Sequence, residues 1–151
     1  MVFQISDRYG TTQGRVQPSP GSKGVLQLEW DSEGEYLAIL QAGTGVVQLW
    51  VKSSNGKVSG LETGEKENTF MAWSKVGPEL AIGSAKGNLY IYNRQSRIMV
   101  PVKGKHQKPI TCGAWNRNNK LAMGSKDKQI TISNDQVRPI KRSSCAHQNC
   151  R

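Results

Sequence analysis

The chain offers few residues that could carry out acid–base or nucleophilic chemistry. It has two histidines, His106 and His147, and no two of its eleven acidic residues form a pair at a catalytic spacing. The sequence contains no Ser/His/Asp constellation and no Gly-x-x-x-x-Gly-Lys-Ser/Thr phosphate loop. We therefore expect a protein that is not an enzyme and that uses no cofactor.

A second group of chemically interesting residues lies close to the C-terminus. Cys145, His147 and Cys150 are types that bind zinc, but a structural zinc site usually takes four ligands, and this cluster supplies three at an uncommon spacing. We expect no metal site. Residues 135–151 are basic and poor in apolar side chains, which predicts a disordered tail.

Composition and charge narrow the class of protein. Apolar residues make up 36% of the 151, and no apolar run approaches the roughly 18–20 residues that cross a bilayer, so no transmembrane segment is expected. Three scattered cysteines favour a reducing compartment, hence the cytoplasm. The net charge of +10 suits nucleic acid, acidic lipid, tubulin or an acidic protein, and by itself selects none of them.

The elements that position these residues are organised by an internal repeat. Trp30, Trp73 and Trp115 recur at intervals of 43 and 42 residues. Each is followed by a polar turn, a Leu-Ala pair, a turn of small residues, and a short apolar run at 47–50, 89–92 or 130–133. Three features in the same order three times indicate a repeat architecture.

The period fits two architectures, the four-stranded blade of a WD-repeat β-propeller and the helical pair of HEAT or armadillo repeats. The closing runs alternate with period two and are rich in β-branched and aromatic residues, as in strands. Gaps of about six residues between apolar runs leave no room for helices. The sequence therefore predicts an all-β fold, a partial WD-repeat β-propeller.

The repeats also predict where each module begins and ends. We expect first strands at 26–30, 69–73 and 110–115, second strands at 36–40, 79–83 and 120–124, and outer strands near 57–61 and 98–103. These give repeats at 25–67, 68–109 and 110–134. Residues 1–24 resemble the second half of a preceding blade and a linker, because Asp7 falls where Asn93 and Asn134 fall.

This count of repeats gives about three blades and a half. A propeller closes with 4–8 blades, so we expect sheets that do not close on themselves, and terminal faces that are bare and apolar. The sequence in hand is then expected to be part of a longer propeller.

The repeats resemble WD repeats in particular residues. Gly104, Lys105 and His106 stand where WD repeats carry a Gly-His pair, and the resemblance implies a hydrogen bond from His106 to Asp127 in the turn before the third strand. The serine or threonine and the tryptophan that complete this network in WD repeats are replaced by Met123 and Ser133. We interpret His106, Asp127 and five aromatic positions as structural; the aromatic positions are Trp30, Trp50, Trp73, Tyr92 and Trp115.

A longer stretch resembles one family more closely. It is carried by Trp73–Gly77, Leu80-Ala81, Gly83, Lys86–Leu89, Ile91–Asn93, Gly104–His106, Ile110–Gly113 and Trp115-Asn116. This stretch is similar to the N-terminal propeller of the WD repeat-containing protein 19 family, a subunit of intraflagellar transport complex A. The resemblance covers about residues 2–134.

The resemblance implies a non-catalytic scaffold that supports retrograde ciliary transport, cilium assembly and the entry of membrane receptors into cilia. Implied partners are other complex A subunits and ciliary cargo adaptors. From the basic loops we also expect weak contact with acidic lipid or tubulin surfaces. The implied location is the cytoplasm, the ciliary base and the axoneme. Two alternatives stay open: an adaptor in another multiprotein complex, and a basic nucleic-acid-binding module, although no RNA-binding aromatic signature occurs.

Overall fold

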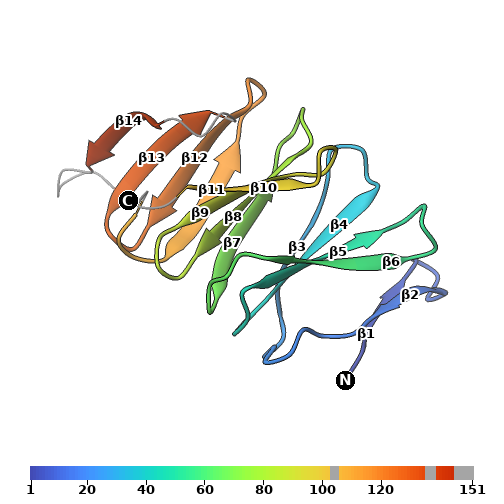
Figure 1. Ribbon diagram of the computed structural model, residues 1–151. Helices are drawn as coiled ribbons and strands as arrows, with labels where there is room; N and C mark the ends of the chain where they lie inside the picture. The colour runs from blue at the N-terminus through green and yellow to red at the C-terminus, as the bar shows by residue number, and fades with distance from the viewer. Residues whose placement is uncertain (103–105, 135–138, 145–151) are drawn as a thin grey trace. The chain divides into compact units, whose positions relative to one another are not determined.

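A computed structural model describes residues 1–102, 106–134 and 139–144, and in these residues it contains strands and no helix (Figure 1). This confirms the all-β prediction. The chain divides into two compact units, Met1–Asn68 and Thr69–Arg151, which are called here the first and the second unit. No helix able to cross a membrane occurs in the part of the chain that the structure describes.

The first unit holds a two-stranded and a four-stranded antiparallel sheet. β1 (Phe3–Ser6) pairs with β2 (Thr12–Val16). The larger sheet has its strands in sequence order, as follows: β3 (Val25–Trp30), β4 (Tyr36–Gln41), β5 (Val46–Val51) and β6 (Lys57–Glu62). The smaller sheet packs on the larger one, since Phe3, Ile5 and Val16 join a cluster with Leu37, Ile39, Trp50 and Val58.

The second unit holds two four-stranded antiparallel sheets, each again with its strands in sequence order. One comprises β7 (Asn68–Trp73), β8 (Glu79–Ser84), β9 (Leu89–Asn93) and β10 (Ile98–Val102). The other comprises β11 (Ile110–Trp115), β12 (Lys120–Ser125), β13 (Gln129–Asn134) and β14 (Pro139–Ser144). β7 begins at the last residue of the first unit and continues in the second.

Hydrophobic contacts join the two sheets of the second unit into one core. Phe70 and Ala72 of β7 and Ala81 of β8 pack with β9, β10 and the second sheet in a cluster completed by Leu89, Ile91, Val102, Ile110, Trp115, Leu121 and Met123. Gly83 allows this close packing, because a Cβ placed there would lie 2.9 Å from Cβ of Ile110. The run Leu80–Ser84 of β8 is buried throughout, as expected for a strand covered on both faces.

One sequence-based expectation about the third repeat is wrong. Residues 139–144 lie in β14, which pairs with β13 between Gln129 and Ser133, whereas the sequence predicts a disordered tail over 135–151. An outer strand is held mainly by backbone hydrogen bonds and needs few apolar side chains, as the mostly exposed β6 illustrates. Cys145, His147 and Cys150, which the sequence groups as types able to bind zinc, lie outside the described residues.

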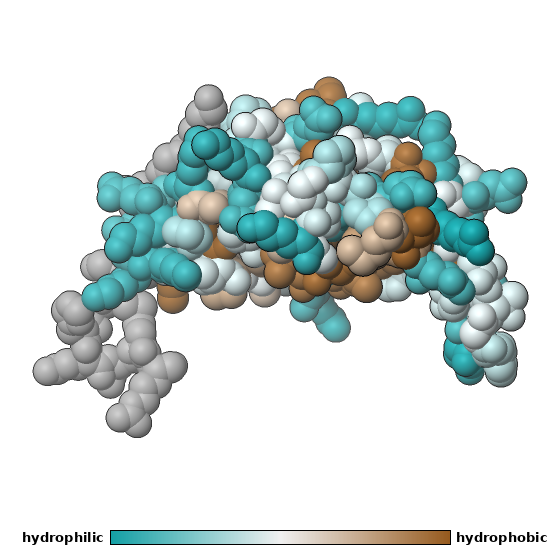
Figure 2. Space-filling model, turned by 90° about the horizontal axis from the view of Figure 1, so that it is seen from below, coloured by the Kyte–Doolittle hydropathy of each residue, from teal (hydrophilic) through white to brown (hydrophobic). Residues whose placement is uncertain are grey.

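Several large apolar side chains reach the surface, and Figure 2 shows apolar patches among hydrophilic residues on the face drawn there. The strands that contribute them are β3 (Val25, Leu26, Leu28 and Trp30), β10 (Ile98 and Val100) and β13 (Ile130 and Ile132). Exposed apolar faces of sheets mark candidate contact surfaces.

Candidate interaction site

A polar network fixes one end of the sheets in the second unit. His106 is 3% exposed, and its Nδ1 lies 2.9 Å from Oδ2 of Asp127. Its Nε2 lies 3.0 Å from Oγ1 of Thr131 on β13. The turn between β12 and β13 places Asp127, and the connection from β10 to β11 carries His106. Three segments are thus joined through one imidazole ring.

The Asp127 carboxylate accepts hydrogen bonds from other groups besides His106. Burial alone would raise its pKa, but backbone N–H groups of Gln107 and Gln129 donate to it at 3.1 and 2.9 Å. With the bond from His106, they hold the pKa of Asp127 below its ordinary value of 3.8. The ionised carboxylate requires a proton on Nδ1, so in the neutral ring Nε2 accepts from the Thr131 hydroxyl.

The sequence predicts that this network lacks its hydroxyl group, because Met123 occupies the place of the usual serine or threonine. The position of Thr131 shows that this prediction is wrong. Met123 of β12 and Thr131 of β13 are direct cross-strand partners. The hydroxyl is therefore supplied from the neighbouring strand at the paired position. Ser133, which holds the place of the usual tryptophan, is buried, and its Oγ has no partner among the described residues.

Further hydrogen bonds to backbone carbonyls hold the surrounding loops together. Ser125 Oγ donates to the carbonyl of Lys108 at 2.9 Å, and the N–H of Lys126 donates to the carbonyl of Pro109 at 3.1 Å. Gly87, with a φ of 89°, passes so close to the His106 carbonyl that a Cβ would collide with it. Both ring nitrogens of His106 are engaged, so this arrangement holds loops together and leaves no ring nitrogen free for a substrate.

The five aromatic positions singled out from the sequence have two kinds of environment. Trp50, Trp73, Tyr92 and Trp115 are buried. Trp115 also donates from Nε1 to the carbonyl of Ala72 at 2.9 Å, which links β11 to β7. Trp30 stands at the equivalent place in the first unit but is 45% exposed, against 2% for Trp115.

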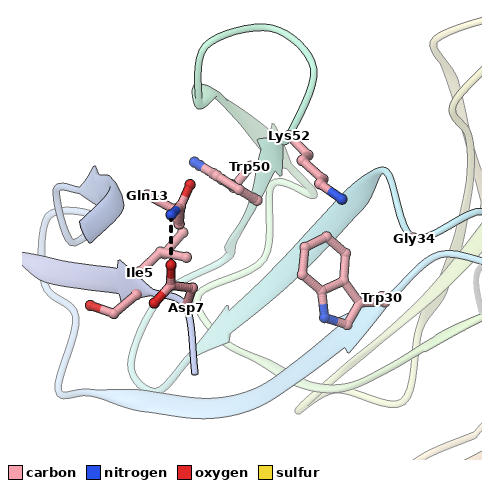
Figure 3. Close-up of a pocket in the computed structure, with 8 residues that line it drawn as sticks. Ile5, Asp7, Gln13, Trp30, Gly34, Trp50 and Lys52 are labelled. Carbon is pink, nitrogen blue, oxygen red and sulfur yellow. Dashed lines mark hydrogen bonds between the residues drawn. The ribbon is translucent and has the colours of Figure 1, made fainter. Parts of the chain in front are cut away.

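A cavity of about 490 Å³ opens beside Trp30 in the first unit (Figure 3). The rings of Trp30 and Trp50 meet edge to face, with centroids 6.0 Å apart and planes at 72°. The other lining residues are Ile5, Ser6, Asp7, Gln13, Gly34 and Lys52. These residues lie on β1 and β2 or next to β3 and β5. The two tryptophans form one wall of the cavity, and mainly polar residues form the other.

The polar wall of the cavity is ordered by Asp7. Its carboxylate accepts backbone N–H groups of Thr11 and Tyr9 at 3.0 and 2.8 Å and the side-chain amide of Gln13 at 3.2 Å. The Thr11 bond contributes most to lowering the pKa of Asp7 below its ordinary value. Gln13 and Lys52 carry no sequence signal for this cavity, because its walls come from strands distant in the sequence.

Charge is distributed unevenly between the two units. The first unit has six basic and eight acidic residues, and the second has fifteen basic and three acidic ones, so the second unit carries all of the net positive charge. Exposed lysines of the second unit surround the His106 network in the turns at that end: Lys86, Lys108, Lys126 and Lys128. Such a surface attracts acidic partners. The described residues contain no cluster of three potential metal ligands.

Comparisons with known proteins identify the family. A sequence model described as "WDR19 first beta-propeller" matches residues 1–150. The chain belongs to the WD repeat-containing protein 19 family. It is similar to human WD repeat-containing protein 19, with 41% identity over 143 residues, and to WD repeat-containing protein dyf-2 of Caenorhabditis elegans, with 39% identity over 90 residues.

These relatives are much longer. The match to human WD repeat-containing protein 19 spans 94% of this chain and 10% of the human protein, and the match to dyf-2 spans 58% and 6%. Among solved structures, a chain in "Crystal Structure of Mitotic Checkpoint Complex" aligns with a TM-score of 0.70 and 25% identity, covering 86% of this chain and 40% of that one. Family membership supports a WD-repeat scaffold role, since such modules are typically non-catalytic platforms for protein interaction.

Proposed function

We propose that this chain is a non-catalytic scaffold of the intraflagellar transport A complex that supports retrograde ciliary transport, cilium assembly and trafficking of membrane receptors into cilia. The observation that carries the proposal is the match of residues 1–150 to the first propeller of the WD repeat-containing protein 19 family. Its partners would be other complex A subunits and ciliary cargo adaptors, at the ciliary base and along the axoneme.

The geometry supports a platform for binding. Antiparallel sheets hold the turns at fixed positions, and the His106–Asp127–Thr131 network ties the loops of the second unit together. Exposed lysines in those turns offer contacts to acidic protein segments, and weakly to acidic lipid or tubulin. Rigid loops on a sheet framework favour binding, because little conformational entropy is lost when a partner docks.

The direct test is to express the tagged chain in ciliated cells and to identify the proteins that co-purify with it. Enrichment of complex A subunits and a signal at the ciliary base and axoneme are expected. A tagged WD-repeat chain of similar size from the mitotic checkpoint class serves as the control, since it shares the fold but should not enrich complex A. Diffuse cytosolic signal without complex A subunits would contradict the proposal.

A second candidate is an adaptor in another multiprotein complex. The alignment with a chain of a mitotic checkpoint complex favours it, because that chain has the same fold within an assembly. The same co-purification separates the two candidates. Consistent recovery of subunits of a different complex, in place of complex A, would support the second.

A further inference from the structure

The turn that joins β9 to β10 carries a serine between two arginines. Arg94, Gln95, Ser96 and Arg97 follow Asn93, the last residue of β9, and precede the first residue of β10. Ser96 and Arg97 are exposed, and the hydroxyl group of Ser96 has no hydrogen-bond partner among the described residues. This hydroxyl group is therefore accessible to an enzyme that modifies serine.

Other hydroxyl groups of the chain lack this combination of exposure and basic neighbours. Four serines are buried: Ser19, Ser74, Ser84 and Ser133. Of the serines whose side chains the structure describes, Ser96 is the one that follows an arginine by two residues. Ser54, in the corresponding turn between β5 and β6, is exposed but has Lys52 at that spacing. Thr11 follows an arginine by three residues, but its side chain is hydrogen-bonded to the carboxylate of Asp7.

Few hydrogen bonds hold the turn in its folded shape. Oδ1 of Asn93 accepts the backbone N–H groups of Gln95 at 2.9 Å and of Ser96 at 3.1 Å. Arg97 has a φ of 58°, in the left-handed region that is unfavourable for residues other than glycine. An exposed turn of this kind opens locally while the sheet stays folded. The segment around Ser96 can then adopt the extended conformation that the substrate groove of a kinase requires.

The surroundings of Ser96 are strongly basic. The backbone N–H of Arg94 donates to the carbonyl of Pro78 at 3.1 Å, so this turn lies beside the turn between β7 and β8. Ser74 of that second turn donates from Oγ to Oδ1 of Asn119, in the turn between β11 and β12. The three turns, with the strand residue that follows each, contain five basic residues: Lys75, Arg94, Arg97, Arg117 and Lys120. They contain one acidic residue, Glu79.

We propose that Ser96 is phosphorylated by a serine/threonine kinase that selects basic residues around its target. Oγ of Ser96 attacks the γ-phosphorus of Mg-ATP, the bond from this phosphorus to the oxygen that bridges it to the β-phosphate breaks, and ADP leaves. The hydroxyl proton passes to the catalytic aspartate of the kinase. Acidic residues in the substrate groove of the kinase pair with Arg94 and Arg97. This inference does not depend on the complex in which the chain works.

A phosphate on Ser96 changes the charge of the turn. Phosphoserine carries about −1.5 to −2 charges at pH 7, so it offsets most of the positive charge of Arg94 and Arg97. Its oxygens accept charge-assisted hydrogen bonds from guanidinium groups. We therefore expect phosphorylation to weaken the attraction of these three turns for polyanions.

Phosphorylation of the purified full chain tests the assignment. The first probe is Mg-ATP with the catalytic fragment of protein kinase C, which selects serines that have basic residues on both sides. The control enzyme is casein kinase II, which selects serines followed by acidic residues. Mass spectrometry should show Ser96 as the first residue modified by protein kinase C, and no phosphate on Ser96 after treatment with casein kinase II. The phosphorylated chain should also elute from a heparin column at a lower salt concentration than the unmodified chain.

Two matched variants test recognition by the kinase. Arg94→Gln should slow phosphorylation of Ser96 at least about tenfold, because it removes a charge-assisted contact with the kinase. Lys52→Gln removes one exposed positive charge at the same spacing before Ser54 and should change the rate by less than about twofold, because distant exposed charges are screened. Unfolding would speed the reaction, so a slower rate reports a loss of recognition. Absence of phosphate from Ser96, faster modification of Ser54 or Thr11, or equal effects of the two variants would overturn the proposal.

Discussion

The imidazole of His106 has a defined partner at each nitrogen, and one of these partners, the Asp127 carboxylate, accepts further hydrogen bonds. Its carboxylate accepts two backbone N–H groups as well as the ring proton. Hydrogen bonds to a charged group contribute more than those between neutral groups. One ionised side chain therefore contributes to holding the connection before β11 in place.

We predict that Asp127→Asn lowers the free energy of unfolding by about 2 kcal/mol at pH 7, because charge-assisted hydrogen bonds are lost. The folded-state pKa of Asp127 lies below the ordinary 3.8. Its contribution is therefore complete above that value and is lost as the pH falls through the folded pKa. Urea unfolding from pH 6 to pH 2.5 should show the gap between the two proteins closing below about pH 3.8.

Glu62→Gln is the control for this experiment, since Glu62 is exposed at the end of β6. It should change the free energy of unfolding by less than about 0.5 kcal/mol. A gap for Asp127→Asn that stays constant down to pH 2.5 would show that the carboxylate charge is not what stabilises the loop.

The same network shows what the sequence could and could not predict about single residues. His106 and Asp127 stand at positions that match the WD-repeat pattern, so the resemblance to WD repeats implied their pairing. Thr131 was not predicted, because its role depends on the register that sets it opposite Met123. Residues one strand apart become neighbours only once the sheet pairing is known.

Among the elements, β3 and β11 present the same residue type in different surroundings. Trp115 is buried and hydrogen-bonded to β7, whereas Trp30 is half-exposed and its ring packs edge to face with that of Trp50. Equivalent residues of a repeat therefore contribute unequally to the free energy of unfolding, because the contribution of each residue depends on the strand that packs against it.

We predict that Trp115→Phe lowers the free energy of unfolding by about 2 kcal/mol, through the lost hydrogen bond and the smaller buried ring. Trp30→Phe, its matched control, should cost less than about 1 kcal/mol, because a phenyl ring keeps the edge-to-face contact and little volume is buried. Urea unfolding followed by far-UV circular dichroism measures both. Equal costs would mean that Trp30 is covered in solution.

The sequence predicted the strand positions closely, because turns of glycine, asparagine and polar residues bound each apolar run. The strand expected at 110–115 coincides with β11, and the strand expected at 79–83 ends one residue before β8 does. β14 did not follow, because its sequence carries little alternation and its position depends on the edge that β13 offers. Outer strands are the elements for which side-chain pattern is weakest and neighbouring backbone matters most.

For the whole molecule, the sequence indicates three similar repeats, but the structure groups them unequally. The small sheet and the first repeat share one apolar cluster, and the second and third repeats share another. Such grouping depends on which faces are covered, and repeat spacing alone does not encode it. The net charge differs between the same two units, because the excess of basic over acidic residues lies in residues 69–151.

This charge excess leads to a prediction about nucleic acid. Lysines and arginines neutralise phosphates by releasing counterions, so non-specific affinity falls steeply with salt. We predict that the full chain retains duplex DNA on a filter at low salt and shows no appreciable binding at about 150 mM. The variant Lys108→Gln/Lys126→Gln should weaken low-salt binding more than Lys52→Gln/Lys57→Gln, although both pairs remove the same charge, because the first pair lies in the more basic unit. Saturable, sequence-dependent binding that persists at about 150 mM would instead favour the nucleic-acid-binding alternative over a protein scaffold.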